Sequence, residues 1–313
     1  MLTALWSGLG SKVTERWATL LVSPALAFWL GGALAWALGR SGPDGYDGWW
    51  RRLGGMWDRS LGALPTATQA LAVVVGLLAV AASTRLAEAL TFGVLRTLEG
   101  YWPRWAGPAR TALTSLRSGR IDRRTARWRE LARRRNQLTP PEYAEYTALN
   151  AWRASVPPTP RDRMPTALGD VLRAAESRPR HRYGLDAVVC WPRLWLTMPE
   201  QARTEVAAAR ARLDEGARLW LWSLLFALWT VFSWWALPVA AVGMLVGYRM
   251  ALAAAAGYGQ LLQTCFDLYR RSLYEGLGWS QPADAAQEFA MGRSLTAFLE
   301  RGPVLDPPTG GAP

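Results

Sequence analysis

The sequence predicts an all-α integral membrane protein with four transmembrane helices in two hairpins and a helical cytoplasmic domain. Three observations predict this class. Half of the 313 residues are hydrophobic, and they gather in long uncharged runs. Most of the positive charge lies in one long segment between the second and third runs. Helix-start signals recur along the chain, whereas the alternating pattern of β-strands is almost absent.

Each uncharged run can hold about 20 residues of helix, enough to cross a hydrocarbon core of about 30 Å. The predicted spans are residues 17–39, 61–84, 219–237 and 239–266. Pro238 separates the last two spans and predicts a tight turn. Aromatic belts predict tryptophans at the membrane edges. The tryptophans expected there are Trp17, Trp49, Trp50, Trp57, Trp102, Trp105, Trp220, Trp222, Trp234 and Trp235.

The charge distribution predicts the orientation of the chain. Residues 85–218 carry 25 arginines against 14 acidic residues, which accounts for +11 of the net charge of +12. By the positive-inside rule this basic segment is cytoplasmic. An even number of spans then places both chain ends in the cytoplasm and leaves the loop 40–60 and the Pro238 turn outside. The cytoplasmic ends are residues 1–16, the C-terminal helices 267–301 and the tail 302–313, whose proline and glycine content predicts disorder.

A cleaved signal peptide is the alternative interpretation of the N-terminal run. Ala35, Trp36 and Ala37 resemble a small-x-small cleavage site. The apolar run before them is longer than a signal peptide usually has and contains Pro24, which favours a retained span.

Long helices are expected to leave two of the spans. The second span continues with a helical apolar pattern through Leu98, until Pro103 and Pro108 end it. A helix from Pro199 runs without a break into the third span. It would have about 40 residues and a length of about 60 Å.

Three start signals predict shorter cytoplasmic helices. A Pro-rich linker, residues 156–165, precedes Thr166, which is expected to cap a helix through Glu176. Asp186 caps the next helix, and Asp284 begins a last amphipathic helix that ends near Glu300.

Residues 165–194 contain the runs LGDVLRAAE and RYGLDAVVCWPRL. This segment, about a tenth of the chain, resembles part of uncharacterised multi-pass membrane proteins of high-GC bacteria. The resemblance implies a bacterial inner (cell) membrane and no known activity. The order of two spans, a cytoplasmic region, two spans and a tail is similar to bestrophin-type anion channels in topology only.

Arg249 is the one charged residue between Val239 and Phe266. It lies about 16 Å of helix beyond Pro238, close to the bilayer midplane. A charge there costs at least about 2.5 kcal/mol, so it is expected to face a bundle interior or a watery cavity. In an oligomer it would line a pore as a ring of arginines. The alternatives are bonding to carbonyl groups within one subunit or snorkelling toward the interface.

The same span carries small residues at a spacing of four, which allow a second helix to approach closely. They are Gly243, Gly247, Ala251, Ala255 and Gly259. This ridge predicts either a homo-oligomer interface or packing within one subunit. Arg249 lies about 200° around the helix from Gly247 and therefore points away from the ridge.

A basic helix, residues 117–135, carries nine arginines against Asp122 and Glu130. Because it follows the second span, anionic lipid headgroups are the first expected partner. The residues expected to contact them are Arg120, Arg123, Arg124, Arg127, Arg133 and Arg134. A solvated face neutralised by acidic partners is the second interpretation. Nucleic acid is disfavoured, since no binding fold is recognisable.

The sequence offers little for catalysis, and we expect no enzyme, no cofactor and no metal. His181 and Cys190 are near in sequence, but a buried thiol and an exposed imidazole explain them better than a nucleophile pair. Asp44 and Asp47 miss the spacing of a calcium-binding EF-hand loop. Cys190 and Cys265 both lie on the reducing side, so no disulfide is expected.

These patterns leave two functional hypotheses. The first is an oligomeric, channel-like protein controlled by its cytoplasmic helices, with Arg249 in the path. The second is a non-conducting scaffold that docks a cytoplasmic protein through Tyr183, Asp186, Trp191 and Arg193. A lipid-handling transporter is a minor third possibility, for which no inverted repeat is found.

Overall fold

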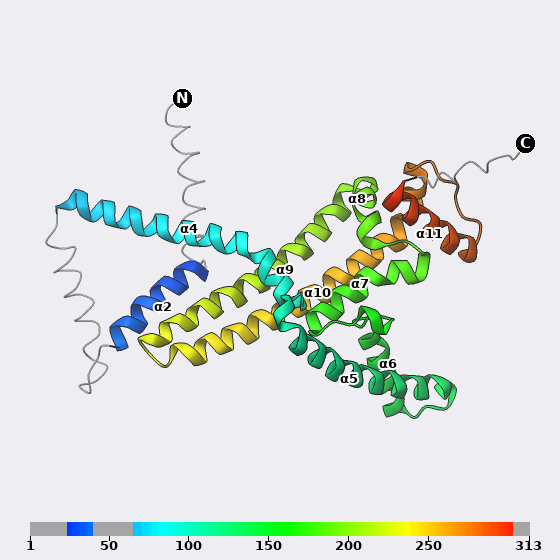
Figure 1. Ribbon diagram of the computed structural model, residues 1–313, viewed down its shortest axis with the longest axis horizontal. Helices are drawn as coiled ribbons and strands as arrows, with labels where there is room; N and C mark the ends of the chain where they lie inside the picture. Colours follow the sequence, from blue (N-terminus) through cyan, green and yellow to red (C-terminus); the bar gives the residue numbers. More distant parts are fainter. Residues whose placement is uncertain (1–23, 40–64, 303–313) are drawn as a thin grey trace, which may run out of the picture. The chain divides into compact units, whose positions relative to one another are not determined.

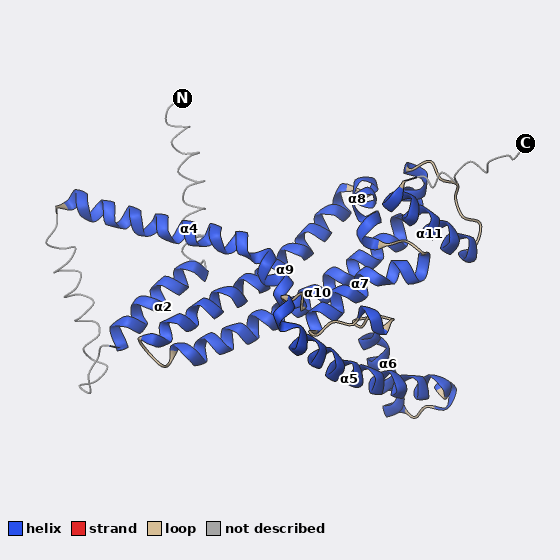
Figure 2. Cartoon of the chain, viewed as in Figure 1, coloured by secondary structure: helices blue, strands red, loops and turns tan. Residues whose placement is uncertain are grey.

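The computed structural model describes residues 24–39 and 65–302, and every regular element in these two ranges is a helix (Figures 1 and 2). The all-helical class predicted from the sequence is therefore confirmed.

The chain divides into two compact units. Of the described residues, the first unit comprises 24–39, 65–95 and 214–250, and the second unit comprises 96–213 and 251–302. Three long helices contribute residues to both units: α4 (Thr66–Glu99), α9 (Glu200–Phe226) and α10 (Ala236–Gly276).

An aromatic cluster packs helix α2 (Pro24–Gly39) within the first unit. The ring of Phe28 lies between 5.3 and 5.5 Å, centroid to centroid, from the rings of Trp29, Trp222 and Trp229. The indole nitrogen of Trp29 donates a hydrogen bond to the hydroxyl of Ser83 on α4 at 3.3 Å. Beneath this cluster lies a small core of Ala25, Val80, Ala87, Leu221 and Trp222.

The small-residue ridge of α10 lies against other helices of the same chain. A side chain at Gly247 would place its Cβ 2.7 Å from the backbone nitrogen of Trp220 on α9, and Gly243 faces Ser223 in the same way. In the second unit, a Cβ at Gly259 would lie 3.0 Å from that of Ala175. Ala251 and Ala255 are fully buried. The described part of the ridge is therefore packed within one subunit.

The helix expected from Pro199 does run without a break into the third span, but its expected length of about 40 residues is wrong, since α9 has 27. Helix α9 ends at Phe226, and a 3₁₀ helix, η6 (Ala227–Val231), follows it. Residues 228–235 read LWTVFSWW, and aromatic and β-branched side chains lose rotamer freedom in a helix. The turn also precedes Pro238, which lies in the first turn of α10, where proline is tolerated.

The helical continuation of the second predicted span is confirmed, because α4 runs without interruption to Glu99. It ends at a different residue from the one expected. Gly100 has a φ of 100°, which favours glycine and breaks the helix before Pro103. Pro108 instead lies in the first turn of α5 (Gly107–Arg133).

The second unit is built from short helices around a larger core. Besides α5 they are α6 (Pro140–Arg153), α7 (Ala167–Tyr183), α8 (Ala187–Thr197) and α11 (Ala285–Arg301), with the 3₁₀ turns η3 (Arg104–Ala106), η4 (Arg135–Gln137) and η5 (Pro160–Asp162). Its fully buried side chains include Phe266, Tyr274 and Leu194.

The three predicted helix caps are confirmed. Thr166 accepts a hydrogen bond from the Gly169 amide, Asp186 accepts from the amides that begin α8, and Asp284 accepts from the Gln287 amide. Helix α7 nevertheless continues seven residues past the expected end, to Tyr183. It stops at Gly184, whose φ of 73° lies in the left-handed region.

By length and composition, two helical stretches of the described chain are suited to cross a membrane, namely the stretch that begins with α4 and helix α10. Helix α2 is apolar but shorter. These features are consistent with a membrane protein; the full set of four spans belongs to the proposal below.

Several expectations lie outside the described residues. They concern the N-terminus 1–16, the first part of the first span, the loop 40–60, residues 61–64 of the second span, the tail beyond Gly302, the acidic pair Asp44 and Asp47, and the tryptophans Trp17, Trp49, Trp50 and Trp57.

Candidate functional site

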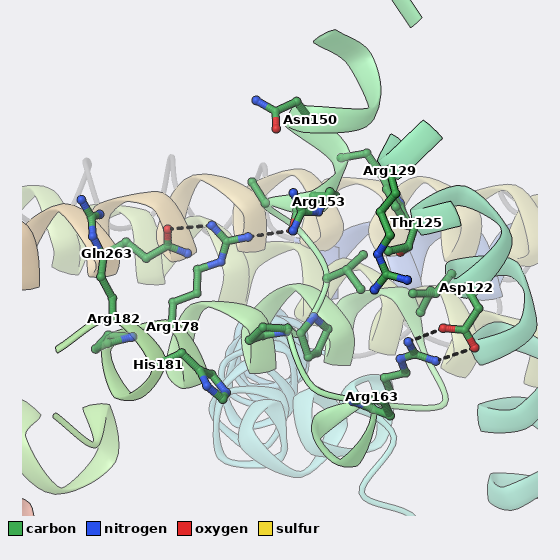
Figure 3. Close-up of a pocket in the computed structure, with 18 of the residues that line it drawn as sticks. Asp122, Thr125, Arg129, Asn150, Arg153, Arg163, Arg178, His181, Arg182 and Gln263 are labelled. Carbon is green, nitrogen blue, oxygen red and sulfur yellow. Dashed lines mark hydrogen bonds and ion pairs between the residues drawn. The ribbon is translucent and has the colours of Figure 1, made fainter. Parts of the chain in front are cut away.

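A cavity of about 990 Å³ lies in the second unit, lined by residues of α5, α6, α7, α10 and the linker between α6 and α7 (Figure 3). Part of its wall is apolar, formed by Ile121, Val156, Phe266 and the prolines Pro157, Pro158, Pro160 and Pro179. Five arginines line the rest, together with His181, Asn150 and Gln263: they are Arg129, Arg153, Arg163, Arg178 and Arg182.

The two aspartates of the lining are already engaged. Asp122 accepts from both terminal nitrogens of Arg163, at 2.6 and 3.1 Å, and this bond holds the pKa of Asp122 below its usual range. Asp267 accepts from the hydroxyl of Tyr183 at 2.5 Å and from Arg182 at 3.3 Å. Three arginines of the lining, Arg129, Arg153 and Arg178, form no ion pair with a carboxylate among the described residues.

Arg178 is the most enclosed of these three. From α7 its guanidinium donates to the backbone carbonyl of Arg153 at 2.6 Å and to the side chain of Gln263 at 3.4 Å, as the dashed lines of Figure 3 show. Burial lowers its pKa, and the positive charge of Arg153 lowers it further. Two like charges are thus held together in a partly desolvated place.

The other two unneutralised arginines approach from α6 and α5. The guanidinium carbon of Arg153 lies 3.5 Å from the centroid of the Trp128 ring, a cation–π contact that fixes its position. Arg129 is exposed and makes no hydrogen bond in the described chain, and its charge helps to lower the pKa of Asp122. Both therefore keep their donor groups available to a ligand.

A buried carboxylate, Asp162, supports the linker beside this cavity. Burial disfavours its charge, but a hydrogen bond from Thr159 at 2.5 Å and the nearby Arg180 and Arg173 outweigh that effect, so its pKa is lowered. His181 lies 3.9 Å from the same carboxylate. These contacts hold η5 against α7 and so fix one wall.

Asp170 fixes the opposite end of the linker. Its carboxylate accepts from Arg117 of α5 at 2.5 and 3.1 Å and from the backbone amide of Met164 at 2.8 Å. One side chain, 1% exposed, thereby joins α5, α7 and the linker.

The six predicted lipid-contacting arginines lie in α5 and at its C-cap, and they fall into three groups. Arg127 and Arg134 bond to Glu145, Glu130 and Glu142, as in the neutralised-face interpretation. Arg124 lies over the ring of Trp152. The remaining three have no carboxylate partner among the described residues and are exposed: Arg120, Arg123 and Arg133.

Of the four residues expected to dock a partner, three serve the second unit itself. Tyr183 is buried on Asp267, Asp186 caps α8, and Trp191 packs against Phe266. Arg193 is exposed. Tyr183 is therefore buried, Asp186 and Trp191 are partly exposed, and Arg193 is exposed, so the docking prediction stays a prediction.

Arg249 is exposed on the first unit and makes no hydrogen bond or ion pair with any described residue. Its neighbours Leu245, Val246 and Met250 are also exposed, by 58%, 45% and 45%. The isolated cation thus lies on an apolar helix surface that no described part of its own chain covers.

Cys190 is fully buried, and burial raises the pKa of its thiol to about 11. Because His181 is exposed, the two side chains form no nucleophile pair. In the ranges 24–39 and 65–302 no three His, Cys, Asp or Glu side chains are grouped as metal ligands would be.

Comparison with protein-family models, curated proteins and solved structures finds no match to this chain. What it does must therefore be argued from its own residues.

None of the five cavity arginines was singled out from the sequence. The available signal was the stretch 173–182, where Arg173, Arg178, Arg180 and Arg182 accompany a single acidic residue, Glu176. That signal does not reveal the contributions of α5 and α6, which depend on tertiary packing.

Proposed function

We propose that this chain is a multi-pass protein of a bacterial inner membrane that assembles into an oligomeric, anion-selective channel. In this proposal the chain crosses the membrane four times, and the second unit supplies the cytoplasmic domain. Arg249 lines the conducting path.

The observation that carries the proposal is the exposure of Arg249 on an apolar helix. If α10 spans the bilayer from its first turn, Arg249 lies about 20 Å along it, within a hydrocarbon core of about 30 Å. An arginine facing lipid at that depth costs about 2.5–3.5 kcal/mol on insertion scales. A neighbouring subunit or a water-filled path removes that cost, and a ring of arginines favours anions.

Exposed apolar surface elsewhere in the first unit supports assembly. Helix α4 exposes Leu71, Val75 and Leu78 by more than half. The ridge of α10 packs against α9 at Gly243 and Gly247 and against α7 at Gly259, so the contact between subunits would use other faces. The α4 surface and the Arg249 face are the described surfaces available for lipid and for neighbouring subunits.

The test is chloride release from liposomes that contain the purified protein, together with a subunit count by native mass spectrometry. We expect chloride release, more than one subunit, and a strong loss of release in Arg249→Ala. Arg271→Ala, which removes an exposed arginine from the other end of α10, is the matched control. Release that is unchanged in Arg249→Ala would show that Arg249 has no role in the path.

The alternative is a non-conducting scaffold. It would dock its partner through the exposed Arg193 and the partly exposed Asp186 and Trp191, because Tyr183 is buried. The absence of any chloride release from a correctly folded, reconstituted protein would favour this alternative over the channel.

A further inference from the structure

The cavity of the second unit is lined by more arginines than carboxylates, with five arginines against Asp122 and Asp267. Arg163 and Arg182 have carboxylate partners, and these pairs hold the wall together. Arg178, Arg153 and Arg129 form no ion pair among the described residues, although the charge of Arg129 helps to lower the pKa of Asp122. Arg178 is partly buried, where a charge without a counter-ion is disfavoured, whereas Arg153 and Arg129 are exposed.

Two hydrogen bonds hold the Arg178 guanidinium in place and leave some of its N–H donors unused. A guanidinium carries five N–H donors, and among the described residues Arg178 uses them in two hydrogen bonds, to the Arg153 carbonyl and to Gln263. Figure 3 shows Arg178 reaching from α7 toward Arg153 and Gln263, and Arg129 reaching down from α5 near Asp122. Contacts hold Arg178 and Arg153 in place, and Arg129 adds an exposed side chain from a third helix.

We propose that this cavity binds a small molecule through a phosphate group, with Arg178, Arg153 and Arg129 as its cationic contacts. The planar fork of arginine matches the oxygens of a phosphate in two-point contacts, and several arginines suit its double charge. The lowered pKa of Arg178 fits the same picture, because an anion would relieve the repulsion from Arg153.

The size and the apolar wall indicate that the ligand has an organic part. About 990 Å³ is near the upper end of the range for small-molecule sites, roughly 300–1,000 Å³, and far exceeds one phosphate ion. Phe266, Trp152 and four prolines of the lining offer apolar contacts. A soluble phosphorylated metabolite and a phospholipid headgroup share this chemistry. The site is independent of the channel proposal, since it lies in the second unit.

The test is isothermal titration of the full-length protein in a non-ionic detergent at constant ionic strength. Sodium pyrophosphate is the soluble probe. Dihexanoyl phosphatidylglycerol is the lipid probe, with dihexanoyl phosphatidylcholine as its uncharged counterpart. The variants are Arg178→Gln and Arg129→Gln. Arg301→Gln removes an exposed arginine from α11, outside the cavity, and is the matched control. Arg129 makes no hydrogen bond or ion pair in the described chain, so its variant is expected to fold.

We expect saturable binding of pyrophosphate that Arg178→Gln and Arg129→Gln each weaken at least about tenfold, as loss of a charge-assisted hydrogen bond does. Arg301→Gln should bind as the unmodified protein does. Binding of phosphatidylglycerol but not pyrophosphate, with the same dependence on Arg178, would support the phosphate site and identify the ligand as lipid. Absence of saturable binding of both probes, or equal affinity in all three variants, would overturn the proposal.

Discussion

Replacing Asp170 with alanine should destabilise the second unit more than any surface change. The carboxylate is 1% exposed and accepts three hydrogen bonds, two from Arg117 and one from the Met164 amide. Removing one partner of a buried ion pair costs about 3–5 kcal/mol, because the other charge is left unpaired. Since the Arg117 side chain is 28% exposed, it regains some hydration, and we expect the lower end, about 3 kcal/mol.

The measurement is thermal unfolding of the full-length protein in detergent, followed by circular dichroism at 222 nm. A domain of 150–250 residues shifts in Tm by roughly 2–4 °C per kcal/mol, so Asp170→Ala should lower the second unit's Tm by about 6–12 °C. Asp170→Asn keeps an acceptor for the Met164 amide, so its Tm should lie between those of the unmodified protein and Asp170→Ala. The control is Glu130→Ala, because Glu130 is 53% exposed and its partners Arg127 and Arg134 are also solvated.

Exposed ion pairs contribute about 0–1 kcal/mol, so the control should shift Tm by at most about 4 °C. A Tm for Asp170→Ala equal to that of Glu130→Ala would refute the argument that this single carboxylate holds α5, α7 and the linker together.

Three further results are expected. Gly247→Ala should destabilise the first unit, because its Cβ would meet the Trp220 backbone at 2.7 Å. Gly257 has open space around it, so Gly257→Ala should be neutral or stabilising by up to about 1 kcal/mol. Chemical unfolding in detergent compares the two variants, and equal stability would contradict the close approach of Gly247 to Trp220. Cys190 should resist N-ethylmaleimide at pH 8 until the protein is unfolded, because burial raises the pKa of its thiol from 9.0 to about 11, and fast labelling of the native protein would disprove this. The contribution of the buried neutral thiol to the free energy of unfolding is complete below pH 9 and is lost as the pH rises through about 11. Asp162 has a lowered pKa, so its contribution to the free energy of unfolding is complete above the ordinary pKa of 3.8 and is lost as the pH falls through its lower folded pKa. Asp162→Asn should therefore make Tm depend less steeply on pH in the acid range, and an unchanged slope would show that other groups determine it.

Local signals in the sequence predicted local structure well. Thr166, Asp186 and Asp284 begin helices because their side chains satisfy free backbone amides, and that chemistry is readable from neighbouring residues alone. The uninterrupted helix through Leu98 followed from apolar periodicity.

Expectations that depended on competition between local and tertiary effects were less accurate. Helix α9 ends at Phe226, because the aromatic and β-branched residues after it have a lower helix propensity. This difference in propensity is small, and the hydrophobic pattern used to predict the span does not reveal it. Helix α7 continues through Pro179, which is buried in the second unit. Proline there would ordinarily end a helix, so packing overrides the local preference.

The cavity could not be predicted because its arginines are distant in sequence. Arg129, Arg153 and Arg178 come from three helices, and only their pairing with carboxylates distinguishes structural from available cations. Arg127 and Arg129 look alike in sequence, yet Arg127 is bonded to Glu145 and Arg129 has no such bond in the described chain.

The central claim is that Arg249 lies in an anion-conducting path. The most direct measurement is the reversal potential of the reconstituted protein in a planar bilayer under a tenfold potassium chloride gradient, compared between the unmodified protein and Arg249→Glu. We expect a reversal potential close to the equilibrium potential of chloride for the unmodified protein and a shift toward the equilibrium potential of potassium in the variant. A current with the same reversal potential in both proteins, or no current in either, would contradict it.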